Sequence, residues 1–127
     1  MSFESKYFAL SEFQCKCGRP ECDAIKEPQA SLVSNLDTLR GLVARPIVIT
    51  SGIRCQFLNS KAGGVADSNH LTGAAADLNC ADSLSRYTLL INALKLFDRI
   101  GVGKSFVHVD VNSDAEHPSR VIWTYYE

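Results

Sequence analysis

Two short apolar segments of the chain each enclose a polar residue that is costly to bury. Asp77 lies among the small apolar residues of 74–78, and His108 lies between two valines in the alternating segment 106–111. The alternation predicts a strand at 106–111, and the apolar run favours a strand at 74–78. Because a buried carboxylate without a partner is strongly unfavourable, Asp77 needs a polar or charged neighbour. The fold must therefore bring such a partner to it.

The rest of the chain alternates between helical and strand patterns. Leu32, Leu36 and Leu39 follow the spacing of an amphipathic helix, and Arg45-Pro46 ends it. In chain order, we expect a helix at 29–43, a strand at 47–50, a helix at 55–62, a strand at 74–78, a helix from 82 or 83 to 97 or 99, and strands at 106–111 and 121–126. This order predicts an α+β fold with a small, mainly antiparallel sheet and helices packed against one side. Residues 1–127 suit a single domain.

The third predicted helix begins at a capping residue, Asp82 or Ser83. Gly101 and Gly103, which follow this helix in the chain, are expected to flank a turn or a short strand. The residues expected to face inward from this helix are Leu84, Tyr87, Leu90, Leu94 and Phe97.

Charge and hydropathy exclude two classes of partner. Thirteen Lys and Arg residues stand against fourteen Asp and Glu residues, a balance that argues against nucleic-acid binding. No apolar run approaches 18 residues, so we expect no membrane insertion. Residues 1–7 lack the apolar core of a secretory signal, so we expect synthesis in a cytoplasm. We also expect a monomer.

His70, Asp77 and His108 carry side chains suited to hold one metal ion. Neutral imidazole and carboxylate are good zinc ligands, and sites with three protein ligands and an open position are the catalytic kind. The residues alone leave other interpretations open. A strand histidine can be a satisfied structural residue, and a buried aspartate can cap a turn or pair with an arginine.

The residues around these three side chains form a more specific pattern. Residues 68–77 read SNHLTGAAAD and fit S-x-H-x-x-G-x-A-x-D, with TSGIR upstream at 50–54 and FVHVDV downstream at 106–111. Over about residues 8–111, the chain resembles the zinc D-Ala-D-Ala carboxypeptidase and L-alanyl-D-glutamate endopeptidase family. These are cell-wall peptidases of bacteria and phages, and the hedgehog signalling domain shares their fold. The opening FALSEF at 8–13 resembles the compact, phage-type members.

The resemblance implies roles for individual side chains. It implies that His70, Asp77 and His108 bind Zn²⁺. Arg54 falls on the arginine near the scissile carbonyl, where a guanidinium can stabilise an oxyanion or bind a substrate carboxylate. A structural ion pair is the alternative for Arg54. Ser68 falls on a serine that would contact the substrate or orient its loop.

One position departs from the family pattern. Many relatives have an acid three residues before the last zinc histidine as general base, and Ser105 stands there in this chain. Asp110 is the nearest acid, and on a strand it shares a face with His108. We expect Asp110 to act as the catalytic base or to orient a metal ligand. A solvated edge position, or a base from elsewhere in the chain, is the alternative.

The cysteines form a second pattern. Cys15, Cys17 and Cys22 lie within eight residues, too few thiols for a complete structural zinc site. Cys55 or Cys80 could supply the fourth ligand if folding brings one of them near. A disulfide and plain buried thiols are the other options.

Taken together, the residues and the resemblance lead to one function and one rival. We expect a zinc metallopeptidase that hydrolyses peptidoglycan stem peptides or cross-bridges, acting on the bacterial cell wall and possibly encoded by a phage. The rival is a non-catalytic zinc-containing binding module of the same fold, which the serine at position 105 favours. His117 is expected to have no role, unless it lines the cleft. Trp123 and Tyr125 are expected to serve packing.

Overall fold

The backbone is arranged around one mixed sheet, seen in the computed structural model, which describes residues 3–114 and 117–125. The helices and strands, in chain order, are η1 (Leu10–Glu12), α1 (Ala30–Val43), β1 (Ile49–Ser51), α2 (Gln56–Lys61), β2 (Ala75–Asn79), α3 (Ser83–Ala93), β3 (Arg99–Val102), β4 (Phe106–Asp110) and β5 (Val121–Thr124). The spatial order of the strands is β1-β2-β4-β3-β5. All neighbours are antiparallel except β3 and β5, which are parallel. The expected α+β class with a mainly antiparallel sheet is confirmed.

The pairing register determines which polar residues become neighbours. Asp77 of β2 lies opposite His108 of β4, and Gly101 of β3 lies opposite His108 on the other side. Two residue pairs further along, Asp110 of β4 lies opposite Arg99 of β3. Side chains of directly opposed residues in antiparallel strands lie on the same face and within reach of each other. The sheet therefore gathers these side chains on one surface.

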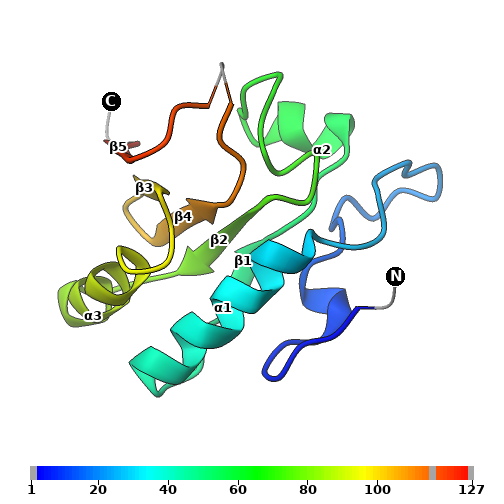
Figure 1. Ribbon diagram of the computed structural model, residues 1–127. Helices are drawn as coiled ribbons and strands as arrows, with labels where there is room; N and C mark the ends of the chain where they lie inside the picture. Colours follow the sequence, from blue (N-terminus) through cyan, green and yellow to red (C-terminus); the bar gives the residue numbers. More distant parts are fainter. Residues whose placement is uncertain (1–2, 115–116, 126–127) are drawn as a thin grey trace.

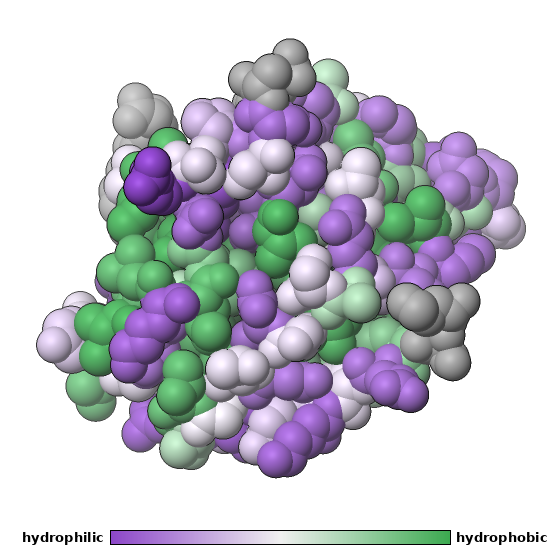
Figure 2. All heavy atoms as spheres, viewed as in Figure 1, coloured by the Kyte–Doolittle hydropathy of each residue, from purple (hydrophilic) through white to green (hydrophobic). Residues whose placement is uncertain are grey.

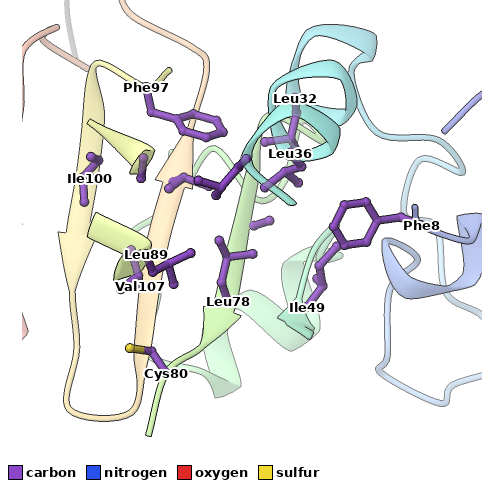
Figure 3. Packing of buried hydrophobic residues seen from close by; sticks show 14 of the residues in the cluster. Phe8, Leu32, Leu36, Ile49, Leu78, Cys80, Leu89, Phe97, Ile100 and Val107 are labelled. Carbon is purple, nitrogen blue, oxygen red and sulfur yellow. The ribbon is translucent and has the colours of Figure 1, made fainter. Parts of the chain in front are cut away.

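The opposite surface of the sheet carries the hydrophobic core. Figure 1 shows α1 and α3 side by side across this surface. Leu32 and Leu36 of α1 pack with Leu78 of β2 and Val107 of β4, all of them buried (Figure 3). Because strand side chains alternate between faces, Val107 enters the core while His108 points away from it. The period of two thus separates a core face from a polar face.

α3 differs from its expected form. It ends at Ala93, and Arg99 already belongs to β3. Leu84, Tyr87 and Leu94 were expected to face inward, but their exposed fractions are 68%, 65% and 53%.

The buried side of α3 carries Leu89 and Ala93 instead. The prediction was wrong because apolar residues occur almost all around this helix, so that periodicity alone did not select one face. Phe97 is buried as expected, and Leu90 is partly buried against the core. Figure 2 shows hydrophobic atoms gathered over α3 on the left of the view.

The other elements lie close to their expected ranges. α1 starts one residue after Gln29 and ends at Val43 as expected, and the last strand ends at Thr124. Tyr126, the expected end of that strand, lies outside the described residues. The segment from Cys15 to Pro28 contains neither helix nor strand. Within the described ranges, no helix has the length and apolar character needed to span a bilayer.

Candidate active site

Three potential metal ligands converge on the polar face of the sheet. His70 lies in the loop before β2, while Asp77 and His108 lie at the centres of β2 and β4. One ligand atom from each lies within 4.8 Å of the others. Oδ1 of Asp77 is 3.2 Å from Nε2 of His70 and 3.0 Å from Nδ1 of His108. The three side chains are at most 8% exposed as residues, so water competes little for them.

Backbone groups hold the His70 ring in one orientation. Nδ1 of His70 donates a hydrogen bond of 2.7 Å to the carbonyl oxygen of Gly52. The His70 backbone is fixed as well, because its N–H donates to Oγ of Ser68 and its carbonyl accepts from the N–H of Arg54. Since Nδ1 carries the proton, Nε2 of the neutral ring has a free lone pair. That lone pair points toward Oδ1 of Asp77, so both atoms could bind the same metal ion.

His108 has an acceptor at each ring nitrogen. Nδ1 faces Asp77, and Nε2 faces Oδ2 of Asp110 at 2.8 Å. Burial lowers the pKa of His108, but hydrogen bonds and charges of Asp110 and Asp77 outweigh burial and raise it. A neutral imidazole has one N–H and can donate to only one of these two carboxylates. The contact at the other ring nitrogen therefore requires a cation between the nitrogen and the oxygen. A proton or a metal ion at Nδ1 satisfies this requirement.

The charge on Asp77 is strongly favoured. Burial raises its pKa, but the interactions of its carboxylate with His108 and His70 outweigh burial and hold that pKa well below its usual range. Its second oxygen, Oδ2, accepts a hydrogen bond of 3.2 Å from Arg54. Asp77 therefore presents an ionised oxygen between two imidazoles. Two histidines and a carboxylate of this kind fit a zinc ion.

Arg54 is fixed at the edge of this cluster by three side chains. Nε donates to Oγ of Ser51 and Nη1 donates to Oδ1 of Asn59, both at 3.1 Å, while Nη2 pairs with Asp77. Asn59 is itself buried and donates to the carbonyl oxygen of Val65. The guanidinium is thus pre-oriented beside the ligand cluster. The ion pair that the sequence allowed as an alternative is present, and it leaves Arg54 lining the cleft described next.

An open cleft of about 610 Å³ lies over the cluster. Ser68, half-buried, lies on its wall with Arg54. Trp123 and Tyr125 from the end of the chain line the same cleft, with the Trp123 ring 5.4 Å from that of His108. These aromatic residues therefore do more than pack against the sheet edge. The site is accessible to a ligand much larger than water.

A comparison with known families agrees with this geometry. The family model described as Peptidase M15 matches residues 6–110, most of the chain. The chain belongs to the Peptidase M15 family. Peptidases of this family are zinc enzymes, and all three converging residues fall within the matched range. No curated protein matches the chain at a significant level.

Asp110 is buried within this M15 site, so the solvated edge position that the sequence allowed as an alternative is wrong. It is 1% exposed, and its Oδ1 accepts a hydrogen bond of 2.7 Å from Nε of Arg99. Its other oxygen contacts His108 on the ring nitrogen that faces away from Asp77. The geometry supports the alternative in which Asp110 orients a ligand. A role as general base stays a prediction.

Arg99 is the site residue that sequence reasoning missed. Its guanidinium pairs with Asp110, donates to the carbonyl oxygen of Pro118 and lies 5.0 Å from the centre of the Trp123 ring. It was assigned to the end of a helix, which hid its place in a strand. The available signal was that a buried Asp110 needs a cationic partner.

His117 lies nearer to the cleft than expected. It lines the cleft, with Nε2 contacting the carbonyl oxygen of Asp67 and Nδ1 contacting Oδ1 of Asp114, both at 2.8 Å. Burial lowers the pKa of His117, but its contacts with Asp114 and Asp67 outweigh burial and raise it. His117 thus meets the condition under which the sequence allowed it a role, because it lies on the cleft wall.

The cysteines separate into two environments. Cys80 is buried in the hydrophobic core. Cys55 joins Cys15, Cys17 and Cys22 in a cluster of thiols. The choice between Cys55 and Cys80 that the sequence left open is thus decided by the fold.

Proposed function

We propose that this chain is a zinc metallopeptidase that hydrolyses peptide bonds in peptidoglycan stem peptides or cross-bridges. The observation that carries the proposal is the convergence of His70, Asp77 and His108 beneath an open cleft, with Arg54 fixed beside them. Membership of the Peptidase M15 family supports the reaction class. The peptidoglycan substrate rests on the resemblance to cell-wall peptidases. Action in a phage setting is part of the same proposal.

In this mechanism, Nε2 of His70, Oδ1 of Asp77 and Nδ1 of His108 would hold the zinc ion. When bound, zinc supplies Lewis-acid polarisation of the peptide carbonyl and lowers the pKa of water to about 7. The residues of the chain supply the rest. Gly52 and Asp110 hold the two imidazole rings in the orientation that ligation needs. The charge of Asp77 partly neutralises the ion.

Arg54 supplies the positive charge that peptide hydrolysis requires. The carbonyl oxygen of the scissile bond becomes negative as water adds to the carbon, and a fixed guanidinium stabilises that charge. Ser51, Asn59 and Asp77 already hold Arg54 in place, so little reorganisation is needed during the reaction. Ser68 is placed to contact the substrate or to keep the His70 loop in position.

Asp110, Asp67 and His117 are the groups on the cleft wall that could accept the proton of the attacking water. Both oxygens of Asp110 already contact cations or N–H groups, which favours a positioning role for that residue. Asp67 and His117 also line the cleft and are the candidates from elsewhere in the chain.

The decisive experiment is incubation of purified muropeptides with the zinc-loaded protein, with products identified by mass. We expect cleavage by the wild type and none by Asp77→Ala, whose folding is checked by circular dichroism. The fragment masses name the bond that is cut. If a folded, zinc-bound wild type cleaves no muropeptide, the peptidoglycan peptidase is refuted. Zinc-dependent binding of the intact muropeptide would then favour the binding module, which Ser105 in place of the usual acid supports.

A further inference from the structure

Four thiols from two distant segments meet on the side of the molecule beside α2. Cys15, Cys17 and Cys22 come from the segment between η1 and α1, which Figure 1 shows beside α2, and Cys55 immediately precedes α2. Their Sγ atoms all lie within 4.8 Å of one another. The sulfurs of a tetrahedral tetrathiolate zinc site lie about 3.8 Å apart, given Zn–S bonds of about 2.3 Å. The cluster is therefore close to the size of such a site.

Backbone N–H groups point at three of the four sulfur atoms. The N–H of Cys55 donates to Sγ of Cys15 at 3.3 Å, and the N–H of Arg19 donates to Sγ of Cys17 at 3.5 Å. The N–H of Leu58 donates to Sγ of Cys55, also at 3.5 Å. Such donors favour a negatively charged sulfur over a neutral thiol. Four thiolates at this separation repel one another strongly unless a cation lies between them.

The backbone around Cys17 and Gly18 orients an N–H group toward the thiol cluster. Gly18 has a φ of +72°, a conformation that glycine adopts without strain, and it turns the chain directly after Cys17. This turn aims the N–H of Arg19 back at Cys17. The Arg19 guanidinium then stacks on the ring of Phe57 in α2, 3.9 Å from its centre. The two segments are thus already apposed around the thiols.

The two simpler explanations fit less well. Burial in the core does not account for the cluster, because Cys15, Cys17 and Cys22 are only half-buried. Cys55 is buried, but it lies outside the packed core cluster that contains Cys80. Disulfides do not account for the cluster either. All five cysteines lie in the part of the chain that the structure describes, and all five are free thiols. A soft, tetrahedral cation is the remaining partner for four convergent thiolates.

We propose that Cys15, Cys17, Cys22 and Cys55 bind a second zinc ion in a closed, structural site. The site is separate from the His70 cluster, and its existence does not depend on peptidase activity. Its effect on the peptidase follows from its position. Cys55 is the residue after Arg54, and the N–H of Ile53 donates a 2.7 Å hydrogen bond to the carbonyl oxygen of Phe13. The second zinc therefore fastens the segment that carries Gly52 and Arg54 to the N-terminal part of the chain.

The test is the zinc content of the whole chain, purified under reducing conditions and measured by mass spectrometry of the metals. We expect two zinc ions per chain in the wild type, one in Cys17→Ser and one in Asp77→Ala. Cys80→Ala is the matched control, because it removes a cysteine outside the cluster, and it should keep both ions. A wild type whose single zinc is lost in Asp77→Ala and kept in Cys17→Ser would overturn the second site. Iron in the thiol cluster would overturn its assignment to zinc.

A spectroscopic test covers the case in which Cys17→Ser does not fold. Asp77→Ala loaded with Co²⁺ in place of zinc should show the intense sulfur-to-metal charge-transfer absorption of a tetrathiolate site. Absence of this band in folded Asp77→Ala with four reactive thiols would overturn the proposal. If the wild type holds one zinc that survives in Asp77→Ala but is lost in Cys17→Ser, the thiol site stands and the zinc peptidase fails. The two proposals can thus be judged separately.

Discussion

At the scale of single residues, the neighbours of a side chain decide its role. Asp110 and Asp77 are both buried strand aspartates, yet they occupy different settings. Asp77 presents one oxygen between two histidine rings, whereas Asp110 is paired with Arg99 and supports the far side of the His108 ring. Carboxylates that support a ligand histidine in this way fix the ring and increase its basicity. The proposed roles that fit this arrangement are ligation for Asp77 and positioning for Asp110.

The substitution Asp110→Asn tests this division. We expect zinc affinity or kcat/KM to fall by about 10- to 100-fold, because the His108 ring loses its charged support. The acidic limb of the pH–rate profile should keep its midpoint. A loss of about 10²- to 10⁴-fold together with disappearance of that limb would instead identify Asp110 as the general base. Asp98→Asn, which alters an exposed carboxylate just before β3, is the control and should leave both quantities unchanged.

At the scale of the elements, α3 shows which signals in the sequence were strong. Its start was predicted because Asp82 is a good cap, and Oδ1 of Asp82 indeed accepts the N–H of Ser85 at 2.8 Å. The predicted end of the helix was wrong, because an apolar run without glycine or proline gives no stop signal. The predicted buried face was wrong, because apolar residues occur almost all around the helix. Local capping chemistry is readable in sequence, whereas the choice between apolar faces depends on what the helix packs against.

The cap predicts how stability changes with pH. The Ser85 N–H, then the Ser85 hydroxyl, lower the pKa of Asp82 in the folded protein. A lowered folded pKa means that Asp82 stabilises the fold above its unfolded pKa of about 3.9 and loses that effect as the pH falls through the folded value. Asp82→Ala should therefore lower Tm at pH 7, and the difference from wild type should shrink below pH 4. Asp82→Asn keeps an acceptor without charge, so it should lower Tm less at pH 7, and this smaller difference should also shrink below pH 4. A constant difference for Asp82→Ala would mean that the carboxylate charge contributes nothing.

At the scale of the whole molecule, the sheet divides stability from chemistry. One face packs against α1 and α3, and the other carries His108, Asp77 and the cleft. Leu36 on α1 is fully buried in the core, while Leu42 on the same helix is 47% exposed. Leu36 therefore probes the core face without touching the cleft, and Leu42 is its exposed counterpart.

Leu36→Ala should lower the free energy of unfolding by about 2–5 kcal/mol, because it removes buried methyl groups and leaves a cavity. Leu42→Ala should have a much smaller effect. Below the unfolding temperature, kcat/KM of both variants should equal that of the wild type, as measured on the muropeptide that the protein cleaves. A large fall in kcat/KM for folded Leu36→Ala would show that the two faces are coupled.

Much of the fold followed from local patterns. The helix at α1 was predicted because its hydrophobic period is regular and proline marks its end. The strands at β2 and β4 were predicted from an apolar run and a regular alternation, and the order of these elements predicted the α+β class. The strand at β3 was only partly anticipated, since a short segment with two glycines gives a weak signal. The ligand cluster was predicted because the pattern at 68–77 and the histidine at 108 resemble a known family, whereas residue types and spacing alone left other interpretations open.

The sequence by itself determined which residues are suited to the proposed chemistry: the two histidines, the acid between them in the chain and three of the four clustered thiols. Residue type and spacing are local properties, and the family pattern is written in them. Tertiary structure alone decided which of these residues meet. The register of β3 on β4 paired Arg99 with Asp110, and the placement of α2 gave Cys55 rather than Cys80 to the thiol cluster. Contacts between residues far apart in the chain depend on how the elements pack, which no local pattern records.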